Sequence, residues 1–330
     1  MSEKKKGSYE EQVEKEFKST QNNGVETVTD LGKVNLNRGA IDLEDDPNIQ
    51  RINSVISYQD VPLDTLPSLG RYLPTDTSIR IRAARVGEIR EFSTMDENNP
   101  KDVIDKLTYI LSQCTKVYYG NVPGSYKDIN AIDRIVIILK IRELTFTDGA
   151  SSIKIPVPEN ACQTVGCKPQ STIDFNTASL TYTEPPQEFE KYYDAVNRCY
   201  IFQTKHFGDI PIYIPSVGVQ ESVTNWALSQ QEDRRKVDVA NAEILPYVIR
   251  DWRGLNDKVI YAKMTELAGW STEKFTLVYR LVEKLNVGIN YELTSTCEKC
   301  GGEIKVPITF PDGYKSLFVP TISDIGDELL

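Results

Sequence analysis

The chain has few of the side chains on which common catalytic sites depend. Its 330 residues include one histidine, three methionines and three tryptophans. Ser-His-Asp and Cys-His mechanisms both need a histidine beside a nucleophile, and His206 stands in Thr-Lys-His-Phe-Gly without an obvious nucleophile or metal ligand next to it. The motifs G-x-G-x-x-G and G-x-x-x-x-G-K-[ST], which hold nucleotide phosphates, do not occur. We therefore expect a protein that is not an enzyme.

Long apolar runs and positive net charge are also missing. The longest aliphatic run, at 135–139, is far shorter than a membrane span, and the polar start of the chain predicts no signal peptide. We expect a cytoplasmic chain without a membrane partner. The net charge is −10, and the one basic cluster, at 234–236, is flanked by acidic residues. Because a sequence-independent nucleic-acid binder needs a basic face, nucleic acid is a disfavoured partner.

Four of the six cysteines stand in two pairs. Cys297 and Cys300 form a C-x-x-C followed by two glycines, and Cys162 and Cys167 form a C-x4-C pair far upstream. Both pairs follow segments that alternate polar and apolar residues, as strands do. Four thiolates at tetrahedral positions bind a structural zinc ion. The pattern predicts one zinc site made by all four cysteines, and no small-molecule substrate.

Two other interpretations of the pairs stay open. In the first, they are a vestigial ribbon whose buried free thiols are held by packing and hydrogen bonds without a metal. In the second, the C-x-x-C is a redox centre, although redox pairs normally begin a helix and this pair lies between predicted strands. Cys114 and Cys199 fall on predicted helical stripes and are expected to be core residues.

The apolar pattern predicts an α+β fold. It has a mainly helical body, short antiparallel strands, a zinc-ribbon-like four-cysteine module and an extended N-terminal tail. Helices are expected at 85–92, 100–114, 128–144, 219–235, 240–252, 257–268 and 271–285. One further helical stripe is expected to contain Phe189, Tyr192, Tyr193, Val196 and Tyr200. Strands are expected at 78–82, 152–156 and within 172–182, with a hairpin from 291–297 and 303–310.

A chain of this length exceeds one hydrophobic core, so several parts are expected. Composition predicts a flexible acidic arm at 1–60, an α+β domain with the first cysteine pair at 61–185, a helical region at 186–288, a ribbon with the second pair at 289–318 and a tail at 319–330.

Several short motifs follow one another in a distinctive order. They are Leu-Pro-Ser-Leu-Gly at 66–70, Ile-Arg-Ile-Arg at 79–82, a helix ending in Cys114, Asp-Arg-Ile-Val-Ile-Ile-Leu-Lys-Ile-Arg-Glu at 133–143, Thr-Asp-Gly at 147–149, and Thr-Cys-Glu-Lys-Cys-Gly-Gly-Glu-Ile-Lys-Val-Pro-Ile at 296–308. In this order the chain resembles the T-even-type bacteriophage baseplate hub proteins of contractile tails, over about residues 62–318. The C-x4-C spacing of the first pair departs from the family's C-x-x-C, and the acidic arm has no counterpart.

The resemblance implies a non-enzymatic structural or assembly protein of the hub or wedge region of a tail baseplate. Such a protein is made in the host cytoplasm, belongs to the virion and contacts other baseplate and tail proteins in a large assembly. The alternative is a zinc-ribbon module that binds nucleic acid or takes part in transcription.

Overall fold

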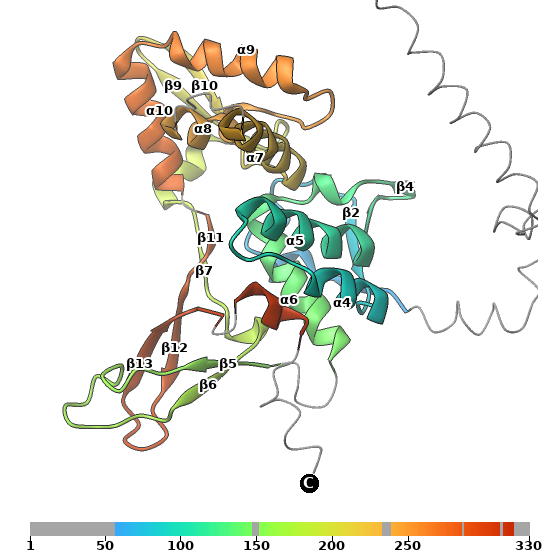
Figure 1. The fold of residues 1–330 in the computed structure, drawn as a ribbon. Coiled ribbons are helices and arrows are strands. Elements are labelled where there is room, and N and C mark those ends of the chain that lie inside the picture. The colour runs from blue at the N-terminus through green and yellow to red at the C-terminus, as the bar shows by residue number, and fades with distance from the viewer. Residues whose placement is uncertain (1–56, 147–151, 233–238, 286, 311–312, 320–330) are drawn as a thin grey trace, which may run out of the picture. The chain divides into compact units, whose positions relative to one another are not determined.

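A computed structural model describes residues 57–146, 152–232, 239–285, 287–310 and 313–319 (Figure 1). The chain divides into two units, Met1–Ser57 and Tyr58–Leu330, and the second contains all the elements below. The predicted arm up to residue 56, the Thr-Asp-Gly turn, the basic cluster at 234–236 and the tail beyond residue 319 lie outside the described residues. The described part combines helices with antiparallel strands, so the predicted α+β class is confirmed. Each of its helices is too short or too polar to span a bilayer.

A four-stranded antiparallel sheet opens the described chain. Its strands, in spatial order, are β1 (Gln59–Val61), β2 (Thr77–Ile81), β3 (Thr115–Tyr119) and β4 (Val122–Pro123). A short 3-10 helix, Leu63–Thr65, lies between the first two strands. Ile79 and Ile81 on β2 are buried, because alternate residues of a strand point to one face.

Three helices contribute to the same core as this sheet. They are α4 (Val86–Ser93), α5 (Pro100–Cys114) and α6 (Arg134–Thr145). Helix α5 has the predicted bounds, because Asn99 caps it by accepting hydrogen bonds from the N–H groups of Lys101 and Asp102. Cys114, its last residue, is buried as expected.

Helix α6 begins later than predicted. Two 3-10 turns, Tyr126–Asp128 and Ala131–Asp133, precede it. The Asp128 carboxylate accepts a 2.9 Å hydrogen bond from the Ser125 N–H and closes the first of these turns. The helix is also buried on more than one face, with Val136, Ile137, Ile138, Leu139 and Ile141 all inside. It therefore lies in the centre of the core and is not an amphipathic surface helix.

Two β hairpins carry the cysteine pairs. The first consists of β5 (Ile153–Pro156) and β6 (Thr172–Phe175), and the second of β12 (Glu292–Thr296) and β13 (Glu303–Pro307), as the alternation predicted. Their inner side chains, including Ile155, Phe175, Leu293 and Ile304, join the main core. A 3-10 turn, Thr177–Ser179, and the short pair of β7 (Tyr182–Thr183) with β11 (Gly288–Ile289) lead into and out of the helical region.

The predicted helical stripe through Phe189, Tyr192, Tyr193, Val196 and Tyr200 is wrong. A 3-10 helix, Gln187–Tyr192, leads instead into the antiparallel sheet β10-β9-β8. The strands are β8 (Tyr193–Asp194), β9 (Cys199–Thr204) and β10 (Gly208–Ile212). Tyr200 and Phe202 are buried at a spacing of two, and Gly208 with φ +68° closes the hairpin. Cys199 is a core residue, as expected, but on a strand.

Four helices complete the described fold, namely α7 (Val217–Glu232), α8 (Val239–Ile244), α9 (Asp257–Ala268) and α10 (Thr272–Leu285). Helices α9 and α10 match their predicted bounds to within a residue. The helix predicted over 240–252 ends at Ile244, since Pro246 cannot donate a backbone hydrogen bond, and a 3-10 turn, Leu245–Val248, follows. A last 3-10 turn, Tyr314–Leu317, returns to the main core, where Phe318 packs edge-on against Phe92.

Candidate metal centre

The two cysteine pairs meet at the ends of the two hairpins. Cys162 and Cys167 lie in the loop between β5 and β6, and Cys297 and Cys300 lie in the loop between β12 and β13. All four Sγ atoms are within 4.8 Å of one another. The Cys162 and Cys300 sulfurs are 3.4 Å apart, and the Cys167 and Cys297 sulfurs are 3.7 Å apart. Each of these two contacts joins one hairpin to the other.

The spacing fits a tetrahedral metal site. A Zn–S bond of about 2.3 Å places tetrahedral sulfur ligands about 3.8 Å apart. The observed separations are too long for a disulfide, and all four cysteines are free thiols. Four soft sulfur donors suit Zn²⁺ or iron and do not suit Mg²⁺ or Ca²⁺. The predicted ligand set therefore forms one cluster whose chemistry suits a structural metal.

The backbone of the second loop wraps around its cysteines. The Cys297 N–H donates to the Gly302 carbonyl at 2.8 Å, and the Gly301 N–H donates to the Cys297 carbonyl at 2.9 Å. Gly301 adopts φ +71°, which a residue with a side chain rarely tolerates. A Cβ on Gly302 would lie 2.5 Å from the Thr164 hydroxyl oxygen, so only glycine lets the two loops approach this closely.

The first loop reaches the same geometry in spite of its wider spacing. The Cys167 N–H donates to the Thr164 carbonyl at 3.1 Å, and Gly166 turns the chain with φ +80°. Cys162 forms an isolated antiparallel bridge with Ile304 on β13. The extra residues form a tight turn, which brings both sulfurs to the cluster.

Local hydrogen bonds shift the pKa values of Cys300 and Cys167 in opposite directions. The pKa of Cys300 is lowered to about 6 by the nearby Thr164 hydroxyl and by the Gly302 N–H, which donates to its sulfur. The pKa of Cys167 is raised to about 12, because its thiol needs its proton to donate to Cys300. Cys300 is thus the first of the two to ionise. A divalent cation would stabilise all four residues as thiolates.

Sequence reasoning missed Thr164. Its hydroxyl oxygen lies 3.5 Å from the Cys300 sulfur, although 136 residues separate the two in sequence. No local spacing rule relates residues so far apart. Its position between the two paired cysteines was the only available signal.

The described residues show no second constellation of this kind. No other group of three or more His, Cys, Asp and Glu side chains in the described part is close enough to share a metal ion. His206 is exposed in the turn between β9 and β10.

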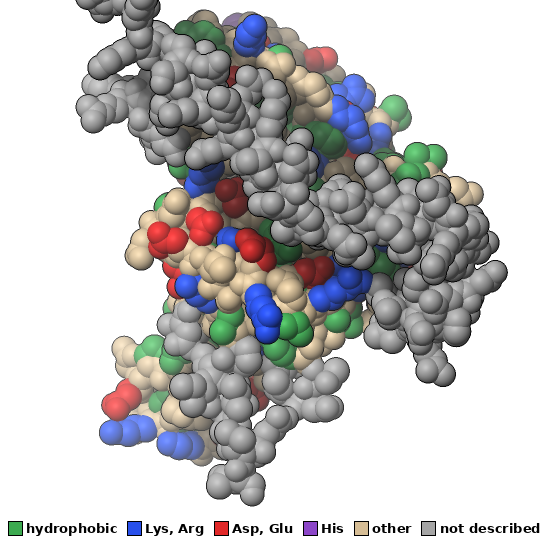
Figure 2. Space-filling model, turned by 45° about the vertical axis from the view of Figure 1, so that its right-hand side comes forward, with side chains coloured by type: hydrophobic (Ala, Val, Ile, Leu, Met, Phe, Trp, Pro, Cys, Tyr) green, Lys and Arg blue, Asp and Glu red, His purple; other side chains and the backbone are tan. Residues whose placement is uncertain are grey.

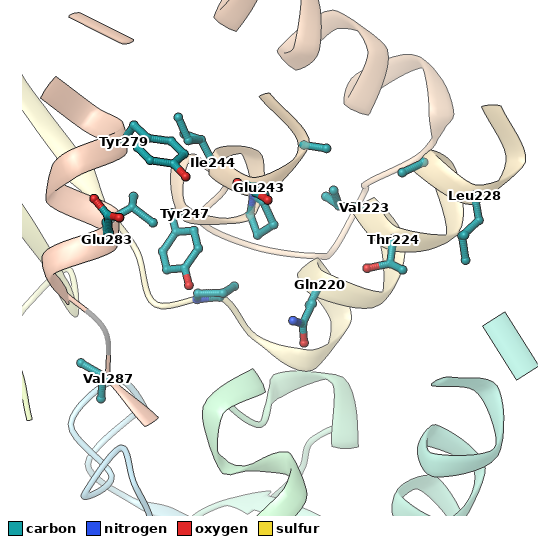
Figure 3. A pocket seen from close by; sticks show the side chains of 15 residues that line it. Gln220, Val223, Thr224, Leu228, Glu243, Ile244, Tyr247, Tyr279, Glu283 and Val287 are labelled. Carbon is teal, nitrogen blue, oxygen red and sulfur yellow. The ribbon is translucent and has the colours of Figure 1, made fainter. Parts of the chain in front are cut away.

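A pocket among the described residues also lacks a catalytic set. It has a volume of about 730 Å³ and lies between α7, α8 and α10 (Figure 3). Glu243 and Glu283 face it from two different helices, beside Tyr247. Among the described residues that line it, none is a histidine, cysteine, lysine or arginine. These residues offer no paired nucleophile and base.

The four cysteines are therefore the one group of His, Cys, Asp and Glu side chains, among the described residues, that is close enough to share a metal ion. Comparisons of the chain with protein-family models, curated proteins and solved structures found no match.

Proposed function

We propose that the chain is a structural or assembly protein that acts through protein–protein contacts, with one zinc ion joining the two hairpins of a zinc ribbon. The cluster of four thiols carries this proposal. Catalytic zinc sites have three protein ligands and leave the fourth position to water or substrate. Four cysteine ligands fill a tetrahedral ion completely, so the metal would stabilise the fold and would not bind substrate.

The order of the sequence motifs supports a place in the baseplate of a contractile phage tail. Two of these motifs touch in the fold: the Ser68 N–H donates a 2.8 Å hydrogen bond to the Asp133 carboxylate. The partners would be other hub or wedge proteins, met during assembly in the host cytoplasm and retained in the virion. Val165, fully exposed at the end of the first hairpin, offers an apolar contact for such a partner.

The surface charge weighs against the alternative of a nucleic-acid-binding ribbon. The hairpin segments 152–175 and 290–310 contain four lysines and five acidic residues. Lys168 lies 3.8 Å from Glu159, and Lys305 lies 3.5 Å from Glu303. Basic and acidic side chains are also interspersed on the visible part of the face in Figure 2. Phosphate binding would need a surface with a clear excess of positive charge.

Metal analysis tests the zinc proposal. The full chain should be purified without added metal and analysed by inductively coupled plasma mass spectrometry. We expect one zinc ion per chain. Cys297→Ser should lose it, while Cys199→Ala, which removes a buried thiol on β9, should retain it. Wild-type protein without metal, or a Cys297→Ser variant with full zinc content, would contradict the proposal.

Co-purification tests the assembly role separately. The chain should form a stable complex with at least one tail or baseplate protein encoded beside its gene, and size-exclusion chromatography should show it. The complex should survive moderate salt. Salt-sensitive retention on DNA, without a protein complex, would favour the nucleic-acid alternative and contradict the assembly role.

A further inference from the structure

A half-buried arginine without a partner lines a second pocket. Arg134 is the first residue of α6, and its guanidinium makes no hydrogen bond or ion pair with any residue that the structure describes. The pocket has a volume of about 400 Å³. Its other walls are mostly apolar or aromatic, and they include Leu107, Ile135, Leu139, Phe175, Leu180 and Ile308.

This position is unfavourable for a positive charge. Burial lowers the pKa of the Arg134 guanidinium, and the partial positive charge at the N-terminus of α6 opposes a cation there. The charge of Glu221 favours the ionised form of Arg134, but the Glu221 carboxylate lies 3.6 Å from the Lys127 amine. Arg142, on the same helix, donates instead to the Ser316 and Leu317 carbonyls. A largely buried cation in a pocket, with no hydrogen-bonded counter-ion, marks a candidate binding site.

We propose that this pocket binds a small amphipathic carboxylate, with its apolar chain or ring between the aliphatic walls and its carboxylate against Arg134. The planar guanidinium fork matches a carboxylate in a bidentate arrangement. The negative charge of Glu221 offsets part of the positive charge of Arg134. The pocket therefore suits the single negative charge of a carboxylate better than the two charges of a phosphate. The volume lies within the usual range for small-molecule sites.

The rim offers further hydrogen-bond donors. Tyr291 and Tyr314 line the pocket, and neither hydroxyl has a hydrogen-bond partner among the described residues. Phe175 on β6 and Ile308, just beyond β13, belong to the hairpins that carry the cysteines, while Arg134 and Leu139 belong to α6. A ligand here would touch both the central helix and the bases of the two hairpins.

Calorimetric titration of the full chain with octanoate tests the proposal. We expect saturable binding, weakened at least tenfold, about 1.4 kcal/mol, by Arg134→Met, which keeps an unbranched side chain but removes the charge. The control Arg90→Met removes an exposed arginine from the last turn of α4, outside the pocket, and should leave the affinity unchanged. Octylammonium, with the same chain and the opposite charge, should not bind. Leu180→Trp should weaken octanoate binding by narrowing the pocket with Arg134 in place.

Thermal unfolding without ligand tests whether Arg134 serves only to stabilise the fold. Arg134→Met should raise the thermal midpoint, because it removes an unpaired charge from an apolar pocket. A structural arginine would give a lower midpoint. Equal octanoate affinity in wild type and Arg134→Met, no saturable binding in the millimolar range, or equally tight binding of octylammonium would each overturn the proposal.

Discussion

Asp133 shows the effect of burial on a single side chain. It is fully buried just before α6, and its Oδ1 accepts a 2.8 Å hydrogen bond from the Ser68 N–H. Within the described part of the chain, Oδ2 has no hydrogen-bond partner. Burial raises the pKa of Asp133 to about 6. Because the folded state holds this proton more tightly than the unfolded state, its contribution to stability is largest below about pH 4 and is lost as the pH rises through 6.

Asp133→Asn should remove this pH dependence. Between pH 4 and pH 7, the free energy of unfolding of the wild type should fall by roughly 2 kcal/mol more than that of the variant. Urea denaturation across this range measures the difference. Asp105→Asn, at an exposed position on α5, is the matched control and should follow the wild type. Parallel curves for wild type and Asp133→Asn would rule out the assigned pKa.

Residue type and spacing were sufficient to predict the four cysteine ligands. Thiol chemistry is specific, and each pair lies in a local turn whose glycines are visible in the sequence. Thr164 and Arg134 were not predicted as site residues. Their surroundings come from segments far apart in the chain, and neither carries a local motif. Side chains defined by tertiary contacts need the fold before their environment can be known.

At the scale of elements, the sequence predicts best the helices that are capped by a residue next to their first turn. Asn99 and Asn256 cap α5 and α9 through hydrogen bonds within their own first turns, so the sequence predicts these helices well. The segment before β9 has aromatic residues at both helical and strand spacings. The cross-strand partners in β8 and β10 decide between them, and a single segment does not reveal its partners.

The link between β2 and α4 depends on a buried ion pair. Arg82 and Glu88 lie 2.6 Å apart with side chains only 9% and 11% exposed. Glu88→Met should cost about 3–5 kcal/mol of unfolding free energy, because it leaves Arg82 buried without its carboxylate. The double variant with Arg82→Met should lose less, as a denaturant-based double-mutant cycle can measure.

An exposed pair between β1 and β2 provides the control. Arg80 and Asp60 lie 2.9 Å apart, with side chains 49% and 71% exposed. Asp60→Met should therefore cost no more than about 1 kcal/mol. If Glu88→Met and Asp60→Met have equal effects, burial does not determine the strength of the Arg82–Glu88 pair.

At the scale of the whole molecule, the cluster joins two hairpins that do not share a sheet. The two hairpins are separate two-stranded sheets, connected by the Cys162–Ile304 bridge and by side-chain contacts such as Gln163 Nε2 to Glu303 at 2.9 Å. A two-stranded hairpin is marginally stable in water by itself. The metal would therefore stabilise the hairpins far more than the helical region.

Metal removal should accordingly have a local effect. After chelation, amide hydrogen exchange should accelerate in β5, β6, β12 and β13, while α7 and α9 keep their protection. The Cys297→Ser variant should show the fast hairpin exchange before chelation and no further change after it. Uniformly faster amide exchange across the chain would contradict a local effect of the metal on the hairpins. It would indicate that the metal controls global stability.

The distance between the cysteine pairs along the chain also has a consequence during synthesis. Cys167 and Cys297 are separated by 130 residues, which a ribosome adds in roughly 7 to 26 s. Throughout that interval the first hairpin holds two thiols of an incomplete site, while the helices between the pairs emerge and fold. Zinc can complete its coordination only after Cys300 has left the ribosome, so metal binding would be a late event in the formation of this fold.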